Sequence, residues 1–252
     1  MIEPKPQLDT PSEIVYLILG SLQFSKACLR TYGHPDLLRV AAAINGDDFV
    51  PFTEALFIKE PGLGASVAWH RDGSTHWESP SWDQGTHGFN FMAQLYGCTA
   101  ANGVWVVPGT HKLRHVDIAK MVGNAKSEQL PDAVPMICSA GDVVISNRQV
   151  VHGSFANTSI DRRITINQGF HRRDSVLNVT AGGLHNARAT YDESRISKRS
   201  AIISKAIVER QKRFPYETPF NYEAKIHPDD LAYWSSPENE DLHDYNLMDL
   251  SI

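Results

Sequence analysis

Trp69-His70-Arg71-Asp72-Gly73 is the stretch around which the rest of the sequence can be organised. It follows the short apolar run Ser66-Val67-Ala68 and has the pattern of a β-strand end. Because residues i and i+2 of a strand point to the same face, we expect His70 and Asp72 to lie side by side. An imidazole nitrogen and a carboxylate oxygen placed in this way can occupy two adjacent positions on a divalent metal.

The His-x-Asp spacing by itself is weak evidence, because it also occurs at residues 34–36, 115–117 and 227–229. Two of these copies have a central proline, which is typical of the first turn of a helix, where aspartate is also favoured. Asp117 precedes a helical pattern and is expected to be its N-cap. Only the 70–72 copy ends a strand. Taken alone, even this copy favours a structural role, so a metal site requires a third ligand elsewhere in the chain.

Composition limits the classes of protein that fit. The 252 residues suffice for one large domain or two small ones, and 42% apolar with 21% charged residues is ordinary for a globular protein. A net charge of −5 argues against a general nucleic-acid binder. Three widely spaced cysteines indicate reduced thiols in a cytosolic protein rather than a disulfide framework or a zinc site. No apolar run is long enough for a membrane span.

The middle of the chain has the pattern of a mainly β fold. The expected strands are 52–59, 66–70, 89–96, 104–107, 134–138, 143–146, 150–152 and 163–170. About eight short strands separated by turns favour a sandwich, a jelly roll or a barrel. Helices are expected on both sides of the strands. They are 10–30, which begins at a capping box, 35–44 and 194–213, with residues 113–132 helical or irregular and an extended tail from Phe214.

His152 is the best candidate for the third ligand, because it ends a short strand and a glycine follows it. Arg163 opens the last strand eleven residues later, on the same face as Thr165 and Asn167. A guanidinium on a polar interior face is a natural bidentate clamp for a carboxylate such as that of 2-oxoglutarate. The competing interpretation is that Arg162 and Arg163 are solvated charges at a turn.

Three blocks together resemble the phytanoyl-CoA dioxygenase (PhyH) family of Fe(II)/2-oxoglutarate oxygenases. The blocks are 69–73, 102–112 (Asn-Gly-Val-Trp-Val-Val-Pro-Gly-Thr-His-Lys) and 141–144 with His152-Gly153-Ser154 and Arg163. They occur in the family's order and spacing, and the similarity spans about residues 52–170. The resemblance implies a double-stranded β-helix, a cupin-like jelly roll with flanking helices. It implies a single oxygenase domain over 1–252, with N-terminal helices (1–50), a jelly-roll core (51–172) and a C-terminal helix with an extended tail (173–252).

The resemblance also implies the residues of the site. His70, Asp72 and His152 would be the iron ligands, and Arg163 with Ser154 would hold the cosubstrate 2-oxoglutarate. Met92 departs from members that carry tryptophan in the cosubstrate-facing strand. Asn90, Met92 and Gln94 share that face, so all three are assigned to cosubstrate binding. The long polar loop 73–87 is expected to be a lid over the substrate, with contacts from His76, Trp77 and Trp82.

The resemblance therefore implies an oxidoreductase that uses O2 and releases succinate and CO2. Hydroxylation of a small organic metabolite, in specialised metabolism, is the expected reaction, while desaturation, epoxidation and ring closure use the same machinery. The alternative is a non-catalytic jelly-roll protein that retains a metal or ligand site. A metal-dependent hydrolase would need an acid–base carboxylate beside the triad. The sequence predicts a cytoplasmic protein without nucleic-acid or membrane partners, and a homodimer is compatible with it.

Overall fold

The computed structural model describes residues 14–52, 54–62, 66–72, 82–125, 129–181, 189–236, 242 and 245. Two compact units divide these residues. The first contains the described residues within Met1–Ile18, Leu56–Gly85 and Asn90–Asn167, and the second contains those within Leu19–Ala55, Thr86–Phe89 and Gln168–Ile252. No helix in the described part of the chain is both long and apolar enough to span a membrane.

The first unit is built on a four-stranded antiparallel sheet in the order β4-β9-β6-β7. Its strands are β4 (Val67–His70), β9 (Val151–Ser154), β6 (Val104–Val107) and β7 (Val134–Pro135). The register aligns His152 of β9 with His70 of β4 on one side and with Val106 of β6 on the other. This sheet carries the two predicted histidine ligands on neighbouring strands.

A larger sheet follows the order β1-β3-β10-β5-β8. Its strands are β1 (Leu17–Leu19), β3 (Ala55–Lys59), β10 (Arg163–His171), β5 (Gly88–Gln94) and β8 (Val143–Asn147). Strands β5 and β10 have residues in both units, and the far end of β10 pairs with β2 (Val50–Pro51) in the second unit. Antiparallel sheets with flanking helices confirm the predicted jelly-roll class.

One face of the four-stranded sheet packs beside helix α4 (Ile118–Ala125). Val107, Leu130 and Val151 form the buried centre of this cluster, and apolar residues of α4 and Trp69 pack against it. At the start of α4 the backbone N–H of Lys120 donates to Asp117 Oδ1 at 2.9 Å, so Asp117 caps the helix as its sequence predicted. A short helix, η2 (Thr110–Lys112), follows β6.

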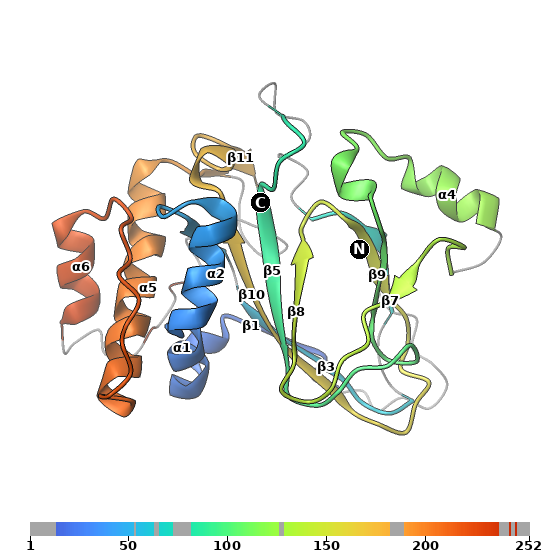
Figure 1. Ribbon diagram of the computed structural model, residues 1–252, viewed down its shortest axis with the longest axis horizontal. Coiled ribbons are helices and arrows are strands. Elements are labelled where there is room, and N and C mark those ends of the chain that lie inside the picture. Colours follow the sequence, from blue (N-terminus) through green and yellow to red (C-terminus); the bar gives the residue numbers. More distant parts are fainter. Residues whose placement is uncertain are drawn as a thin grey trace. The chain divides into compact units, whose positions relative to one another are not determined.

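The second unit is mainly helical. Its elements are η1 (Ser21–Gln23), α1 (Lys26–Tyr32), α2 (Pro35–Asn45), η3 (Arg173–Ser175), β11 (Thr180–Ala181), β12 (Ala189–Thr190), α5 (Glu193–Arg213) and α6 (Pro228–Ser235). Helix α5 contacts both α1 and α6 and lies between them in Figure 1. Tyr32, Phe49 and Phe170 form an aromatic core, with ring centroids 5.5–5.6 Å from Phe170.

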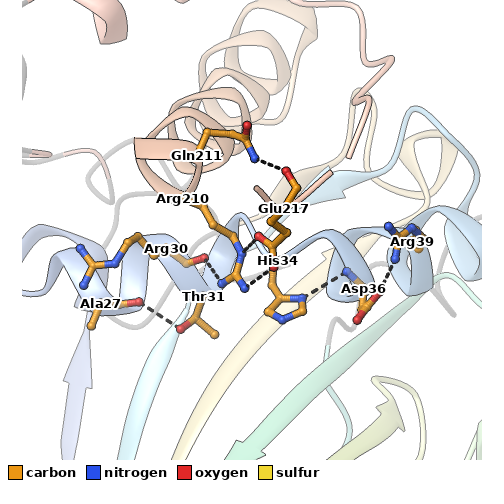
Figure 2. A network of polar contacts seen from close by, with 9 residues as sticks. All are labelled: Ala27, Arg30, Thr31, His34, Asp36, Arg39, Arg210, Gln211 and Glu217. Carbon is orange, nitrogen blue, oxygen red and sulfur yellow. Dashed lines mark hydrogen bonds and ion pairs between the residues drawn. The ribbon is translucent and has the colours of Figure 1, made fainter. Parts of the chain in front are cut away.

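The C-terminal end of α5 is anchored by a polar network (Figure 2). Arg210 pairs with Glu217, and its Nη1 donates to the backbone oxygen of Arg30 at 3.2 Å. In the same view His34 caps α2, because its Nδ1 accepts the backbone N–H of Asp36 at 3.2 Å. His227 caps α6 in the same manner. The prediction that these two His-Pro-Asp copies begin helices is confirmed.

Two predicted elements differ in the structure. The expected helix over 10–30 is interrupted, because residues 17–19 form β1 and Gly20 adopts a left-handed backbone with φ of 66°. A new helix starts only after Ser25, whose Oγ accepts the N–H of Cys28. The capping box at 10–13 lies outside the described residues. The tail from Phe214 is not wholly extended, since α6 forms at Pro228, where proline and two aspartates favour a first helical turn.

Candidate metal centre

The pairing of β4 with β9 brings the predicted ligands together within the first unit. His70 lies opposite His152 in the register, and their ring centroids are 4.1 Å apart. Asp72 lies just beyond the end of β4, where its backbone N–H donates to the carbonyl of Arg148 at 2.9 Å. One side-chain ligand atom from each of the three residues lies within 4.8 Å of the others. Two imidazoles and one carboxylate at this separation suit a divalent transition metal such as Fe(II).

Backbone carbonyls orient both imidazoles in the same way. His70 Nδ1 lies 2.7 Å from the oxygen of Ala68, and His152 Nδ1 lies 3.0 Å from the oxygen of Val150. Since a carbonyl only accepts, each neutral ring carries its proton on Nδ1 and leaves the Nε2 lone pair for a metal. The two Nε2 atoms face the carboxylate, at 3.4 Å for His70 and 3.8 Å for His152.

Asp72 is held by a chain of polar contacts. Asn90 Nδ2 donates to Asp72 Oδ2 at 3.0 Å, and Arg148 Nη1 donates to Asn90 Oδ1 at 3.3 Å. Burial alone would raise the pKa of Asp72, but the charges of His152 and Arg148 and the hydrogen bond from His70 hold it well below its usual range. The carboxylate is therefore ionised and available as an anionic ligand at neutral pH.

The two histidines differ in their electrostatics. Burial would lower the pKa of His70, but its hydrogen bond and charge interaction with Asp72 raise that pKa overall. Burial lowers the pKa of His152, although the negative charge of Asp72 opposes this shift. Metal binding would compete with protonation of both imidazoles, because a metal takes the neutral form of the ring.

Arg163 is buried, and the described structure gives it no carboxylate partner. Its Nη1 donates to the carbonyl of Asn102 at 2.9 Å and to Ser154 Oγ at 3.5 Å, while its buried Nε has no hydrogen-bond partner. Burial lowers the pKa of Arg163 to about 10, so the group is still a cation at neutral pH. The neighbouring Arg162 is exposed and pairs with Glu60 at 2.8 Å. Of these two arginines, only Arg163 faces the interior, as expected from the alternation of side chains along the strand.

The three cosubstrate residues predicted on β5 lie at two different sites, Asn90 beside the triad and Met92 with Gln94 beside Arg163. The amide of Asn90 contacts Asp72 of the triad, as described above. Met92 and Gln94 line a small cavity together with Arg163, and Gln94 Oε1 accepts the hydroxyl of Thr165 at 2.7 Å. The same cavity is lined by Cys98, Val104, Met136 and Val144. Asn90 thus orients a candidate metal ligand, while Met92 and Gln94 lie beside the candidate carboxylate anchor.

Of the three predicted substrate residues, only Trp82 belongs to the described part of the chain. His76 and Trp77 lie outside the described residues, as does most of the expected lid. Trp82 is half-buried, and its indole N–H has no hydrogen-bond partner in the described structure. Their roles stay predictions.

Sequence reasoning missed a pocket beside His70. This pocket of about 430 Å³ is lined by Trp69, His70, Arg71, His115, Val116, Asp117 and Ile118. Arg71 holds one side of it, because its guanidinium donates to the carbonyls of Gln149, Arg114 and Leu113 at 2.7–3.0 Å. The His-x-Asp copy at residues 115–117 was interpreted only as a helix start, and nothing local to it signals that it lies near residue 70.

Lys59 of β3 was also missed. It is buried, and its Nζ donates to the carbonyl of Phe155. Burial and the nearby charge of Arg163 lower the pKa of Lys59 to about 7. A lysine at the end of a strand is ordinarily exposed to solvent. Only the tertiary structure identifies Lys59 as a buried basic residue near Arg163.

Comparisons with known proteins agree with this geometry. Residues 23–165 match the model of the family described as phytanoyl-CoA dioxygenase (PhyH). Phytanoyl-CoA dioxygenase 1 of Oryza sativa subsp. japonica is 28% identical over 109 residues, which cover 40% of this chain and 37% of the rice protein. This chain therefore matches little more than a third of that relative's length.

Solved structures show the same fold. AviO1 from Streptomyces viridochromogenes Tue57 is 28% identical with a TM-score of 0.52, over 67% of this chain and 72% of that one. EctD from S. alaskensis, solved with 2-oxoglutarate and 5-hydroxyectoine, is 21% identical with a TM-score of 0.54. The alignment with EctD covers 66% of this chain and 58% of the other, and supports the fold.

Proposed function

The chain belongs to the phytanoyl-CoA dioxygenase family, and from this premise we propose that it is an Fe(II)/2-oxoglutarate-dependent dioxygenase. Its proposed reaction is hydroxylation of a small organic metabolite by O2, with release of succinate and CO2. The observation that carries the proposal is the convergence of His70, Asp72 and His152, whose ligand atoms lie within 4.8 Å of one another. Backbone carbonyls hold both imidazoles by Nδ1, which leaves each Nε2 available for a metal.

Each residue has a distinct proposed role. His70, Asp72 and His152 would hold the iron, and Asn90 would keep the carboxylate of Asp72 in position. Arg163 would bind the distal carboxylate of 2-oxoglutarate, with Ser154 beside it. When bound, iron and 2-oxoglutarate supply the oxidising power for attack on a C–H bond. The described residues supply ligand orientation and the buried positive charge.

The pocket beside His70 is the proposed substrate site. It borders a candidate metal ligand, and its wall combines the apolar surface of Trp69 and Ile118 with the polar groups of His115 and Asp117. Such a lining suits a small organic molecule that carries hydrogen-bonding groups. The loop 73–87, which follows Asp72, is proposed to add substrate contacts through His76, Trp77 and Trp82. The cytoplasmic location and the homodimer stay predictions.

The decisive experiment combines iron binding with a metabolite screen for succinate release. We expect the wild-type protein to bind one Fe(II) and to convert 2-oxoglutarate to succinate with a suitable substrate. His152→Ala should lose both activities, because only two ligands remain. His115→Ala is the matched control, since it should keep stoichiometric iron and lose only substrate affinity. Iron binding without succinate from any substrate would favour the non-catalytic alternative, and unchanged iron binding in His152→Ala would refute the triad.

The carboxylate anchor has its own test, which compares two adjacent arginines. Arg163→Ala should raise the KM for 2-oxoglutarate by at least tenfold, because a buried charge-assisted contact contributes about 1.5–3 kcal/mol. Arg162→Ala should leave that KM unchanged, since its side chain is exposed and pairs with Glu60. Steady-state kinetics with 2-oxoglutarate as the varied substrate measures both. A larger effect from Arg162→Ala would contradict the assignment.

A further inference from the structure

Cys98 and Cys138 face each other across an isolated antiparallel bridge in the first unit. The N–H of each donates to the carbonyl of the other, at 2.8 Å and 3.1 Å, and their Sγ atoms are 3.1 Å apart. Residues that exchange both backbone bonds have Cα atoms about 5.5 Å apart, which is within the span of a disulfide. A covalent S–S bond therefore requires the sulfurs to approach by about 1 Å without rearrangement of the backbone.

The position of the pair connects it to the carboxylate anchor. Cys98 is buried and lines the same small cavity as Arg163, Met92 and Gln94. Its thiol also donates to the carbonyl of Met136 at 2.8 Å. Cys138 is partly exposed, so an oxidant from solvent reaches Cys138 first. The two cysteines are forty residues apart in the sequence, from which they were predicted to be reduced thiols. Only the fold brings their sulfur atoms together.

We propose that Cys98 and Cys138 are a site of reversible oxidation, at which hydrogen peroxide converts the two thiols into a disulfide and weakens 2-oxoglutarate binding at Arg163. The effect on 2-oxoglutarate rests on the proposed function. Peroxide first oxidises the Cys138 thiol to a sulfenic acid, with cleavage of the O–O bond and release of one water. The Cys98 sulfur then attacks the Cys138 sulfur, and the sulfenic oxygen leaves as a second water. Two thiols lose two electrons, and one peroxide gains them.

The expected effect on the anchor follows from the movement of Cys98. Formation of the bond draws its sulfur towards Cys138 and removes the S–H donor that now contacts Met136. The wall of the cavity beside Arg163 then changes shape, so a ligand fitted to the reduced form packs less well. Burial, with the adjacent Cys98 thiol, raises the pKa of Cys138 to about 12. Little thiolate exists at neutral pH, and the pair should therefore respond slowly, to sustained rather than brief oxidation.

The modification itself is tested by mass and thiol count, without any assay of activity. Metal-free protein is treated with hydrogen peroxide in the presence of a chelator, so that iron-driven radical chemistry does not contribute. We expect loss of two of the three thiols, a peptide that links residues 98 and 138, and full reversal by dithiothreitol. Cys28→Ser should lose both of its thiols and form the same link, and Cys138→Ser should form no internal link. Sulfinic acid at either cysteine without a link, or no reaction at all, would overturn the proposal.

The effect on the anchor is measured by calorimetric binding of 2-oxoglutarate. Oxidised and reduced protein are freed of peroxide, loaded with Fe(II) without oxygen, and titrated. We expect at least a threefold increase in Kd on oxidation, reversed by dithiothreitol and absent in peroxide-treated Cys138→Ser. A linked protein whose Kd is unchanged would overturn the coupling to Arg163. A protein that forms the link but binds no 2-oxoglutarate in either state would instead contradict the proposed function.

Discussion

At the scale of single residues, Lys59 is the least expected group in the first unit. Its ammonium is buried and donates to the carbonyl of Phe155, and its neighbour Arg163 is a second buried cation. Burial and this repulsion lower the pKa of Lys59 from its ordinary value of 10.5 to about 7. Two adjacent cations without a described carboxylate partner form an interior region that favours anions, which is what a dicarboxylate cosubstrate requires.

The lowered pKa predicts how stability changes with pH. Below about pH 7 Lys59 is charged in the folded and in the unfolded protein, so the folded protein bears the full free-energy cost of burying this charge. Between that pH and 10.5 the unfolded chain binds the proton more strongly than the folded protein, so stability rises with pH. Relative to Lys59→Met, the free energy of unfolding of metal-free wild type should therefore increase, by on the order of 3 kcal/mol between about pH 7 and about pH 10.

Urea unfolding of both proteins across this range provides the measurement. Lys120→Met is the matched control, because it removes the same charge from an exposed position in α4 and should show no such slope. A difference between wild type and Lys59→Met that is constant with pH would show that Lys59 stays charged in the folded protein.

At the scale of elements, the close approach of β4 and β9 sets the geometry of the triad. Gly153 lies next to His152 in β9 and faces residues of β4. A Cβ at Gly153 would lie 3.2 Å from the Trp69 ring and 3.2 Å from the carbonyl of Val67. These contacts are tighter than ordinary van der Waals packing, so a side chain here requires the Trp69 ring or the β4 backbone to shift by a few tenths of an ångström. His70 would move with β4, because it is the last residue of that strand.

We therefore expect Gly153→Ala to weaken iron binding roughly tenfold, as changes that misplace metal ligands commonly do. It should also lower the free energy of unfolding by about 1–3 kcal/mol through overpacking. Iron titration and urea unfolding measure the two effects. Gly123→Ala in α4 is the control, since its Cβ would meet nothing within 4 Å and should leave iron binding unchanged. Equal iron affinity in Gly153→Ala and wild type would mean that the strands adjust without moving the ligands.

At the scale of the whole molecule, the second unit joins segments that are far apart in the chain. Arg199 of α5 and Glu54 are both fully buried, and their closest charged atoms lie 3.7 Å apart. Arg199 Nη2 also donates to the carbonyl of Phe52 at 2.8 Å, and its guanidinium lies 5.2 Å from the centre of the Tyr245 ring. This single side chain therefore connects the segment before β3 with α5 and with a residue near the C-terminus.

Arg199→Met should destabilise the protein by about 3–5 kcal/mol, because it leaves the Glu54 carboxylate buried without its cation. Adding Glu54→Gln should restore part of this loss, since the uncompensated charge is then removed. Urea unfolding of the single and double variants measures the coupling. Lys198→Met, an exposed change in the same helix, should have little effect. A double variant no more stable than Arg199→Met would show that the charge pairing is not the cause.

The features that could be predicted from the amino-acid sequence are local ones. Helix α2 and strand β6 were predicted almost to the residue, because the caps and turn residues at their ends act over a few positions. The interior position of Arg163, in contrast to Arg162, followed from the alternation of side chains along a strand. The triad was reached only through the resemblance of three ordered blocks, since His-x-Asp spacing alone did not distinguish residues 70–72 from the copies that begin helices.

The contacts between distant segments could be identified only from the folded structure. The pairing of β4 with β9, the Cys98–Cys138 bridge and the pocket at His115 all join residues that no local pattern relates. The break at Gly20 belongs here too, because residues 17–19 have apolar spacing that fits a helix but form a strand in the larger sheet. The physical reason is that burial and strand pairing are shared between segments, and these tertiary contributions outweigh the small intrinsic propensities that a sequence displays.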